Sequence, residues 1–209
     1  MSVATDRLEN TTIYDRARTD LYALLAVLLI QPPSAKVLAG VRNLAVAESL
    51  PQRLHAALIL VREAARSRSL ADLDVEFQEL FIGLSCGQIV PFASWYRERR
   101  LMAGPLAELR GELRCLGLCR REGFCEPEDH AGVLCEILAM ISREDSGVSL
   151  ERQGVFFRTH ALPWLPRFFS DLQGLRGALF YRDVGNLGEL FMSTDARYLS
   201  PAEFTGGEP

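Results

Sequence analysis

The chain has 209 residues, of which 48% are hydrophobic and 24% charged. This balance is typical of a folded globular protein and excludes a disordered or fibrous chain, and the length suffices for one large domain or two small ones that share a core. With a net charge of −4, the chain lacks the broad positive field of non-specific nucleic-acid binders. We therefore expect no nucleic-acid partner, whereas a basic peptide is an acceptable one.

The N-terminus, the longest apolar run and the cysteines favour a cytoplasmic protein. The first ten residues contain no basic segment followed by an apolar core, so we expect no secretory signal. The longest apolar run, residues 21–30, is shorter than the roughly 20 residues of a membrane-spanning helix and predicts a buried helix without stable membrane insertion. An odd number of cysteines in no small secreted framework indicates reduced thiols. They are Cys86, Cys115, Cys119, Cys125 and Cys135.

The first half of the chain has the apolar spacing of amphipathic helices. Ser34 and Asp72 are candidate N-caps, Pro51 suits a first helical turn, and Gly83 is placed to end the helix that Asp72 begins. The expected helices, with approximate ends, are residues 14–30, 34–48, 51–67, 72–81, 94–101 and 104–117. Residues 84–93 hold a glycine and a proline and are expected to form a loop.

The second half begins with a charged, glycine-containing connection over residues 120–126. A long helix is expected from Pro127, with its apolar stripe reaching residue 141. The remaining expected elements are a helix over 149–161, a break and restart at 163–166, an amphipathic segment over 176–191 and a loose tail after Ser200. No sustained strand-like alternation or internal repeat is present. The sequence therefore predicts an all-α fold of about 9–11 helices in two halves, 1–118 and 119–209, joined by a hinge and forming one intertwined unit.

The segment EPEDH at residues 126–130 has a structural and a functional interpretation. In the structural one, Pro127 occupies a first helical turn, acidic residues complement the helix dipole, and His130 is a polar surface residue. In the functional one, an acidic patch with an imidazole lies beside a groove and engages arginines of a partner. Asp129 and His130 are adjacent on a helix and point about 100° apart, so they do not form an oriented acid–base pair. No nucleophile elbow or phosphate-binding loop is present, and we expect no catalytic residues.

The cysteines provide an alternative, a small metal-binding protein. Cys115, Cys119 and Cys125, followed by His130 and Cys135, gather soft ligands within a short segment. A second close pair is missing, and Cys135 lies on the expected apolar stripe, so small buried thiols explain the pattern at least as well as zinc does. We expect no metal and no other cofactor.

Two aromatic segments also have two interpretations. Residues 83–96 contain Phe92, Trp95 and Tyr96, which either cover the core or form a recognition surface, because Tyr and Trp combine apolar area with a hydrogen-bonding group. The phenylalanines and Trp164 in residues 156–172 are expected to pack in the core.

Taken together, these segments resemble the TorD/DmsD family of cytoplasmic redox-enzyme maturation chaperones. The ordered pattern is Glu76-x3-Leu80-Phe81-x-Gly83, Pro91-x2-Ser94-x-Tyr96, Leu109-Arg110, Gly117-Leu118, Glu126-Pro-x-Asp129-His130, Glu136 and Phe157-x2-His160-x2-Pro163-Trp164-x-Pro166. The resemblance covers roughly residues 15–192. Each fragment alone is weak, but the ordered set is fairly specific.

The resemblance implies a non-enzymatic chaperone. It would bind the twin-arginine signal peptide and the apo form of a molybdenum or tungsten oxidoreductase, assist cofactor insertion and delay export through the Tat translocase. It also implies an all-α TorD-like helical bundle that is a monomer or a domain-swapped homodimer. The implied signal-peptide and client-binding residues are Leu80, Phe81, Gly83, Pro91, Ser94, Tyr96, Glu126, Pro127, Asp129 and His130. Phe92 and Ala93 lie where family members vary, so the client's identity does not transfer.

The residues themselves fit this role. A signal with a basic start and an apolar core needs carboxylates beside an apolar, aromatic groove. Acidic residues at 72–79 and 126–129 are candidates for the carboxylates, and Phe81, Pro91 and Tyr96 for the groove. Charge reversal at Asp129 with the fold intact should then weaken peptide binding, and unchanged affinity would exclude this residue from the site. A permanent subunit of the redox enzyme is the remaining alternative.

Overall fold

The computed structural model describes the backbone of residues 2–83, 87–119 and 126–200, and within these ranges the side chains from Tyr14 onward. These ranges contain ten α-helices and no strand; the one isolated bridge pairs Phe92 with His130. The all-α prediction is therefore confirmed, and the number of helices lies within the predicted 9–11. None of the described helices is long and apolar enough to span a bilayer.

Most of the first-half helices form where the sequence predicts them. In chain order they are α1 (Ser2–Leu29), α2 (Ala35–Arg42), α3 (Gln52–Arg66), α4 (Leu70–Phe77), α5 (Ala93–Glu98) and α6 (Gly104–Cys115). Ser34 caps α2 through a hydrogen bond from the Val37 N–H, as predicted. The α2 helix, however, ends at Arg42 rather than near residue 48.

The start of α4 differs from the prediction. Ser69, not Asp72, is its N-cap, and the Ser69 hydroxyl accepts from the Asp72 N–H while the Asp72 carboxylate accepts from the Ser69 N–H. Asp72 is thus the third helical residue of a capping box. Its carboxylate and the Ser69 hydroxyl both accept hydrogen bonds from backbone N–H groups at the start of α4. The helix continues as a π-helical segment, Gln78–Ile82, and Gly83, at φ 47°, ends it as predicted.

The second half comprises α7 (Ala131–Ser142), α8 (Leu150–Phe156), a π-helical segment (Phe157–Ala161), α9 (Leu165–Gln173) and α10 (Phe180–Tyr198). A short 3-10 helix, Glu144–Ser146, lies between α7 and α8. The helix over 149–161 and the restart near Pro163–Pro166 are confirmed, with Ser149 as the N-cap of α8. Two predicted starts in this half are wrong, since α7 begins at Ala131 rather than Pro127 and α10 at Phe180 rather than near residue 176. Residues 120–125 of the connection expected over 120–126, and the tail after Ser200, lie outside the described residues.

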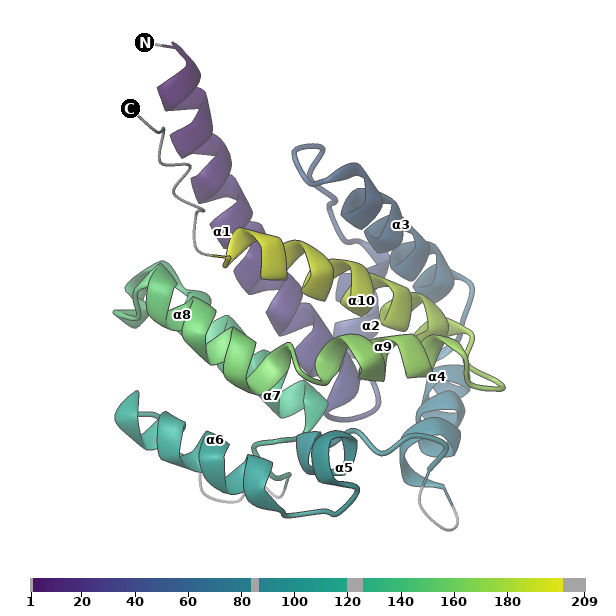
Figure 1. The fold of residues 1–209 in the computed structure, drawn as a ribbon. Helices are drawn as coiled ribbons and strands as arrows, with labels where there is room; N and C mark the ends of the chain where they lie inside the picture. Colours follow the sequence, from purple (N-terminus) through teal and green to yellow (C-terminus); the bar gives the residue numbers. More distant parts are fainter. Residues whose placement is uncertain (1, 84–86, 120–125, 201–209) are drawn as a thin grey trace.

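The core is formed jointly by helices from both predicted halves. In Figure 1, α10 lies across α1, and the N-terminal turns of α1 extend beyond the other helices. α1 packs on α7 and α10, α3 packs on α10, and α9 packs along α10. The largest fully buried apolar side chains include Trp164, Phe168, Phe169 and Phe191, which confirms the predicted core role of the segment around Trp164. The halves thus share one hydrophobic core rather than each having its own.

Candidate functional site

Two of the predicted motif segments, far apart in sequence, meet at one junction. The Ala93 N–H donates to the Asp129 carbonyl at 2.9 Å, and the Ala131 N–H donates to the Pro91 carbonyl at 2.7 Å. The Asp129 carboxylate oxygen Oδ2 accepts from the Ser94 N–H at 3.0 Å and from the Ser94 hydroxyl at 2.6 Å. We call Pro91–Ser94 together with Asp129–Ala131 the junction. It fixes the start of α5 against the start of α7.

Burial gives the junction residues a structural role. Asp129 is 1% exposed, and Pro91, Ser94 and His130 are buried as well. A charge this deep is stable when hydrogen bonds satisfy it, as the two from Ser94 do here. His130 is therefore not a surface residue, and the Asp129 carboxylate does not form part of a surface acidic patch. Charge reversal at Asp129 would place a cation against the Ser94 N–H, so we expect this change to destabilise the junction in addition to any effect on peptide binding.

His130 caps α7 through its ring. Its Nδ1 accepts from the Gly132 N–H at 3.1 Å, so the ring is neutral at this atom, and the Phe92 ring meets it edge-on with centroids 5.2 Å apart. Burial lowers the pKa of His130 from 6.5 to about 4. A proton on Nδ1 would remove the acceptor that α7 uses.

We expect this histidine to make the fold sensitive to acid. His130 takes up a proton near pH 6.5 in the unfolded chain but only near pH 4 in the folded chain. The free energy of unfolding therefore falls as the pH drops through this window. Between pH 7 and pH 5 the loss from this group should be about 2 kcal/mol. Urea denaturation at the two pH values measures it. His130→Asn keeps a capping acceptor and removes the titration, so its loss should be smaller; an equal loss in both proteins would assign the acid sensitivity to other groups.

The first motif segment lies at the end of α4. Leu80 is buried, while Phe81 is half-buried and contacts the rings of Phe77 and Tyr181 at centroid distances of 4.8 and 5.2 Å. Glu76 is 6% exposed, and its two carboxylate oxygens accept from the N–H groups of Leu179, Phe180 and Tyr181. Glu76 therefore caps α10 and offers no charge to a partner.

The Glu126–Glu128 stretch is half-buried and forms a turn before α7. The Pro127 carbonyl accepts from the His130 N–H at 3.0 Å, which holds the turn. The Glu128 carboxylate forms an ion pair with Arg110 of α6 at 2.9 Å. The acidic residues of 126–129 are thus largely engaged within the protein.

An open groove of about 720 Å³ lies beside the junction. Its volume falls within the range of ligand pockets, about 300–1,000 Å³. One wall is the 87–90 segment, another is α5, and the far side is the C-terminal part of α9. The lining residues are Gly87, Gln88, Ile89, Val90, Trp95, Tyr96, Arg99, Leu101, Ser170, Asp171, Gly174 and Leu175.

Short contacts to the π-helical segment Gln78–Ile82 hold the 87–90 wall in place. The Gly87 N–H donates to the Ile82 carbonyl and the Ile89 N–H to the Leu80 carbonyl, both at 3.1 Å. A Cβ at Gly87 would come within 2.5 Å of the Leu80 carbonyl oxygen, so only glycine fits there. The 87–90 wall is thus held by hydrogen bonds to two backbone carbonyls of the π-helical segment that follows α4.

Tyr96 is the predicted site residue that lines this groove directly. Its hydroxyl donates to the Asp171 carboxylate at 2.9 Å, and its ring contacts Trp164 and Phe168 of the core. Pro91 and Ser94 lie next to the groove within the junction, whereas Leu80 supplies a backbone carbonyl to the wall. The aromatic composition of residues 92–96 indicated this surface; the contributions of Arg99, Asp171 and Leu175 had no signal in the sequence.

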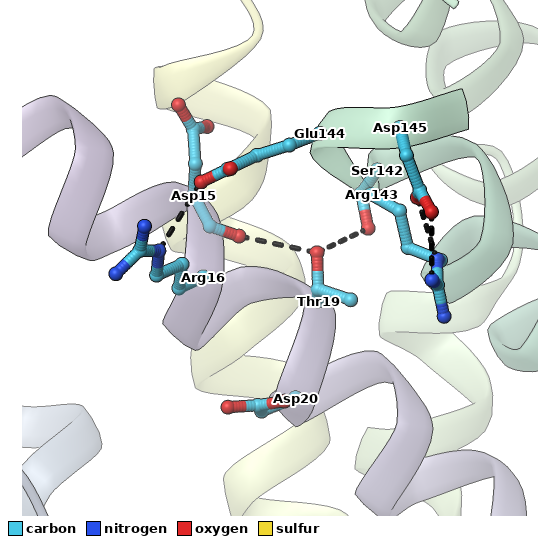
Figure 2. A pocket seen from close by; sticks show the side chains of 8 residues that line it. All are labelled: Asp15, Arg16, Thr19, Asp20, Ser142, Arg143, Glu144 and Asp145. Carbon is cyan, nitrogen blue, oxygen red and sulfur yellow. Dashed lines mark hydrogen bonds and ion pairs between the residues drawn. The ribbon is translucent and has the colours of Figure 1, made fainter. Parts of the chain in front are cut away.

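A second hollow, of about 530 Å³, lies between α1 and the link from α7 to α8. Figure 2 shows that its charged side chains largely engage their neighbours: Arg16 contacts Glu144 at 3.1 Å, and Arg143 contacts Asp145 at 2.8 Å. Thr19 joins the two walls through the Ser142 hydroxyl at 3.0 Å. This hollow is polar and charged, unlike the groove, and lies away from the predicted motif residues.

The cysteines are not brought together where the structure describes them. Cys115 and Cys119 are exposed, whereas Cys135 is fully buried in α7 and burial raises the pKa of its thiol. Among the described residues, no three His, Cys, Asp or Glu side chains are placed to hold a metal ion. Cys86 and Cys125 lie outside these ranges.

Comparison with known proteins gives consistent results. Residues 47–170 match the family model described as nitrate reductase delta subunit. The chain is 27% identical over 183 residues to the chaperone protein TorD of Vibrio cholerae, covering 77% of this chain and 83% of that protein. It is 30% identical over 139 residues to the Tat proofreading chaperone DmsD of Salmonella typhimurium, covering 66% of this chain and 67% of that protein.

A crystal structure of an Archaeoglobus fulgidus protein assigned to redox enzyme maturation has the same fold, with a TM-score of 0.54 and 18% identity over 87% of this chain and 93% of that one. The matching relatives are named chaperones, not enzymes, which supports a non-enzymatic role. The family match covers the whole junction and most of the groove lining, and it ends at residue 170 within α9, before Asp171, Gly174 and Leu175. The chain therefore belongs to the TorD/DmsD family of redox-enzyme maturation chaperones.

Proposed function

We propose that this chaperone binds the twin-arginine signal peptide and the apo form of a molybdenum or tungsten oxidoreductase in the cytoplasm, assists cofactor insertion and delays Tat export. The observation that carries the proposal is the groove beside the junction, because it presents an open, aromatic and apolar surface held by the family's motif residues. The names of the relatives, TorD and Tat proofreading chaperone DmsD, support the same role.

The surface charges support a two-part recognition of the signal. Glu76 and Asp129 are buried and engaged, so they leave the set of candidate partners for arginine. Asp74 and Glu79 remain exposed on α4 and the π-helical segment that follows it. Ile82, 53% exposed, continues this surface toward the 87–90 wall. A basic segment on these carboxylates would place the following apolar residues near the groove.

We also propose that the protein is either a monomer or a domain-swapped dimer. α1 and α3 belong to residues 1–118 but pack on α7 and α10 of residues 119–209. Exchange of halves between two chains through the 119–126 connection would preserve these contacts. Light scattering of the purified protein distinguishes the two states by mass.

Co-expression with a molybdoenzyme precursor tests the proposed function. A tagged chain should capture the full-length apo precursor from cells that cannot make the molybdenum cofactor. It should capture much less of the cofactor-loaded enzyme, and much less of a precursor without its signal. Equal capture of the loaded and apo forms would instead indicate a permanent subunit, and capture independent of the signal would contradict signal-peptide recognition.

A further inference from the structure

A hollow of about 370 Å³ lies between the second half of α3 and the start of α10, which are neighbours in Figure 1. Leu60 of α3 and Leu179, the residue before α10, line it and remain 49% and 43% exposed. We call this site the α3–α10 hollow. An apolar surface that is open to solvent and rimmed by polar side chains is typical of an interaction site. The hollow is therefore a candidate surface for a partner with apolar side chains.

The rim of the α3–α10 hollow is rich in arginine, although the whole chain carries a net charge of −4. Arg68 and Arg182 line the hollow. The lining carboxylate of α3, Glu63, is already paired with two further arginines of the same helix, Arg62 at 3.2 Å and Arg66 at 2.9 Å. The α3 side of the hollow thus carries more positive than negative charge.

The other nearby carboxylates do not cancel this charge. Asp183 also lines the hollow, but its side chain is 15% exposed and lies 3.5 Å from the 58% exposed side chain of Arg182. Hydrogen bonds from the Ser69 N–H and hydroxyl, and to a smaller extent the charge of Arg68, lower the pKa of Asp72. The rim therefore complements a partner with carboxylates, and it repels both the basic start of a signal peptide and a second copy of the same surface.

The α3–α10 hollow lies next to the groove along the chain. Leu175 lines the groove and Leu179 lines the hollow, and the four residues that separate them span at most about 14 Å. A client whose signal occupies the groove would therefore bring part of its mature chain close to the hollow. Since the signal is basic and the rim is positive, the mature part is the better match.

We infer, on the basis of the proposed function, that the α3–α10 hollow binds a segment of the client's mature part in which carboxylates flank apolar side chains. Leu60 and Leu179 contact the apolar side chains, and Arg68 and Arg182 contact the carboxylates. The chaperone then holds its client at two adjacent surfaces, one for the signal and one for the enzyme body.

Two substitutions in the α3–α10 hollow test this assignment. Leu60→Glu removes apolar surface and adds a negative charge, and Arg182→Glu reverses a charge of the rim. Both side chains are exposed, so the midpoint of urea denaturation should stay close to that of the wild type. Met140→Glu on α7 and Arg114→Glu on α6 are the matched controls, because they make similar changes at exposed positions outside the hollow. The probes are the apo precursor captured by co-expression, purified from cofactor-deficient cells, and its synthetic signal peptide.

We expect each hollow variant to weaken binding of the apo precursor at least fivefold and to leave the affinity for the signal peptide within twofold. The control variants should bind both probes as the wild type does. Unchanged affinity for the precursor in both hollow variants would overturn this inference alone. Equal weakening for the two probes would also overturn it, because the hollow would then belong to the signal site. A wild type that binds neither probe would overturn the proposed function, and this inference with it.

Light scattering and sedimentation with phosphatidylglycerol vesicles test the other possible occupants. We expect Leu60→Glu to change neither the mass of the protein in solution nor its binding to vesicles. Self-association or vesicle binding of the wild type that Leu60→Glu abolishes, with the precursor affinity unchanged, would overturn the inference. It would assign the α3–α10 hollow to a second copy of the chain or to an anionic membrane surface.

Discussion

Replacing Asp195 by alanine should lower the free energy of unfolding by about 3–5 kcal/mol, because it leaves a buried guanidinium without its counter-ion. Arg18 on α1 and Asp195 on α10 are 1% and 0% exposed, and their Nε and Oδ1 atoms lie 2.7 Å apart. The Asp195 carboxylate also accepts from the Tyr22 hydroxyl, and Arg18 donates to Gln153 of α8 at 2.7 Å. Burial raises the pKa of Asp195, and the facing Arg18 opposes that effect.

Urea denaturation of the wild type, Asp195→Ala and the double variant Arg18→Met/Asp195→Leu measures this effect. The double variant removes both charges and should lose less stability than Asp195→Ala, since apolar replacement of a whole buried pair is often close to neutral. A loss below about 1 kcal/mol for Asp195→Ala, the range of exposed ion pairs, would contradict the buried network. The pair joins α1 to α8 and α10, so it also holds the two halves of the chain together.

Glu76→Gln should destabilise the protein by about 3 kcal/mol although it changes little in size. The carboxylate accepts from three backbone N–H groups, at 2.8, 3.2 and 2.8 Å, where α10 begins. An amide offers a single acceptor oxygen and turns its NH2 group toward a donor, while the negative charge that favours a helix N-terminus is lost. Hydrogen bonds to charged groups contribute about 1.5–3 kcal/mol, and a buried donor left unsatisfied costs about 1–3 kcal/mol.

Glu79→Gln provides the matched control, since Glu79 is exposed just beyond α4. Its effect on the midpoint of urea denaturation should remain within about 0.5 kcal/mol. If Glu76→Gln proved equally mild, the capping role of Glu76 would be wrong, and this carboxylate would again be a candidate for binding the arginines of a client.

The helices could largely be predicted from the sequence because their signals are local. Apolar spacing, Ser34 and Ser149 as caps, and the glycines and prolines that interrupt the pattern act within a few residues. The wrong starts of α7 and α10 have long-range causes. Residues 127–130 form a turn rather than a helix, and the Asp129 carbonyl and carboxylate accept from Ala93 and Ser94. The start of α10 is set by Glu76, about a hundred residues earlier.

The site could be predicted only in part, for the same reason. The sequence identified the motif segments, but it assigned Asp129 and His130 to the surface because acidic and imidazole groups are usually exposed. Their burial depends on pairing with Pro91–Ser94, which no local pattern reveals. Likewise, the Tyr96–Asp171 contact joins residues 75 positions apart and forms one side of the groove. The residue types were visible in the sequence, whereas their convergence required the fold.

The central claim, signal-peptide recognition by this chain, is tested most directly by calorimetric titration of the wild-type protein with the twin-arginine signal peptides of one genome's molybdoenzymes. An arginine-depleted version of each peptide serves as the control. We predict saturable binding of one peptide, or of a few, with weaker binding of the depleted version. Absence of binding to every peptide, or equal binding of the depleted controls, would contradict the account.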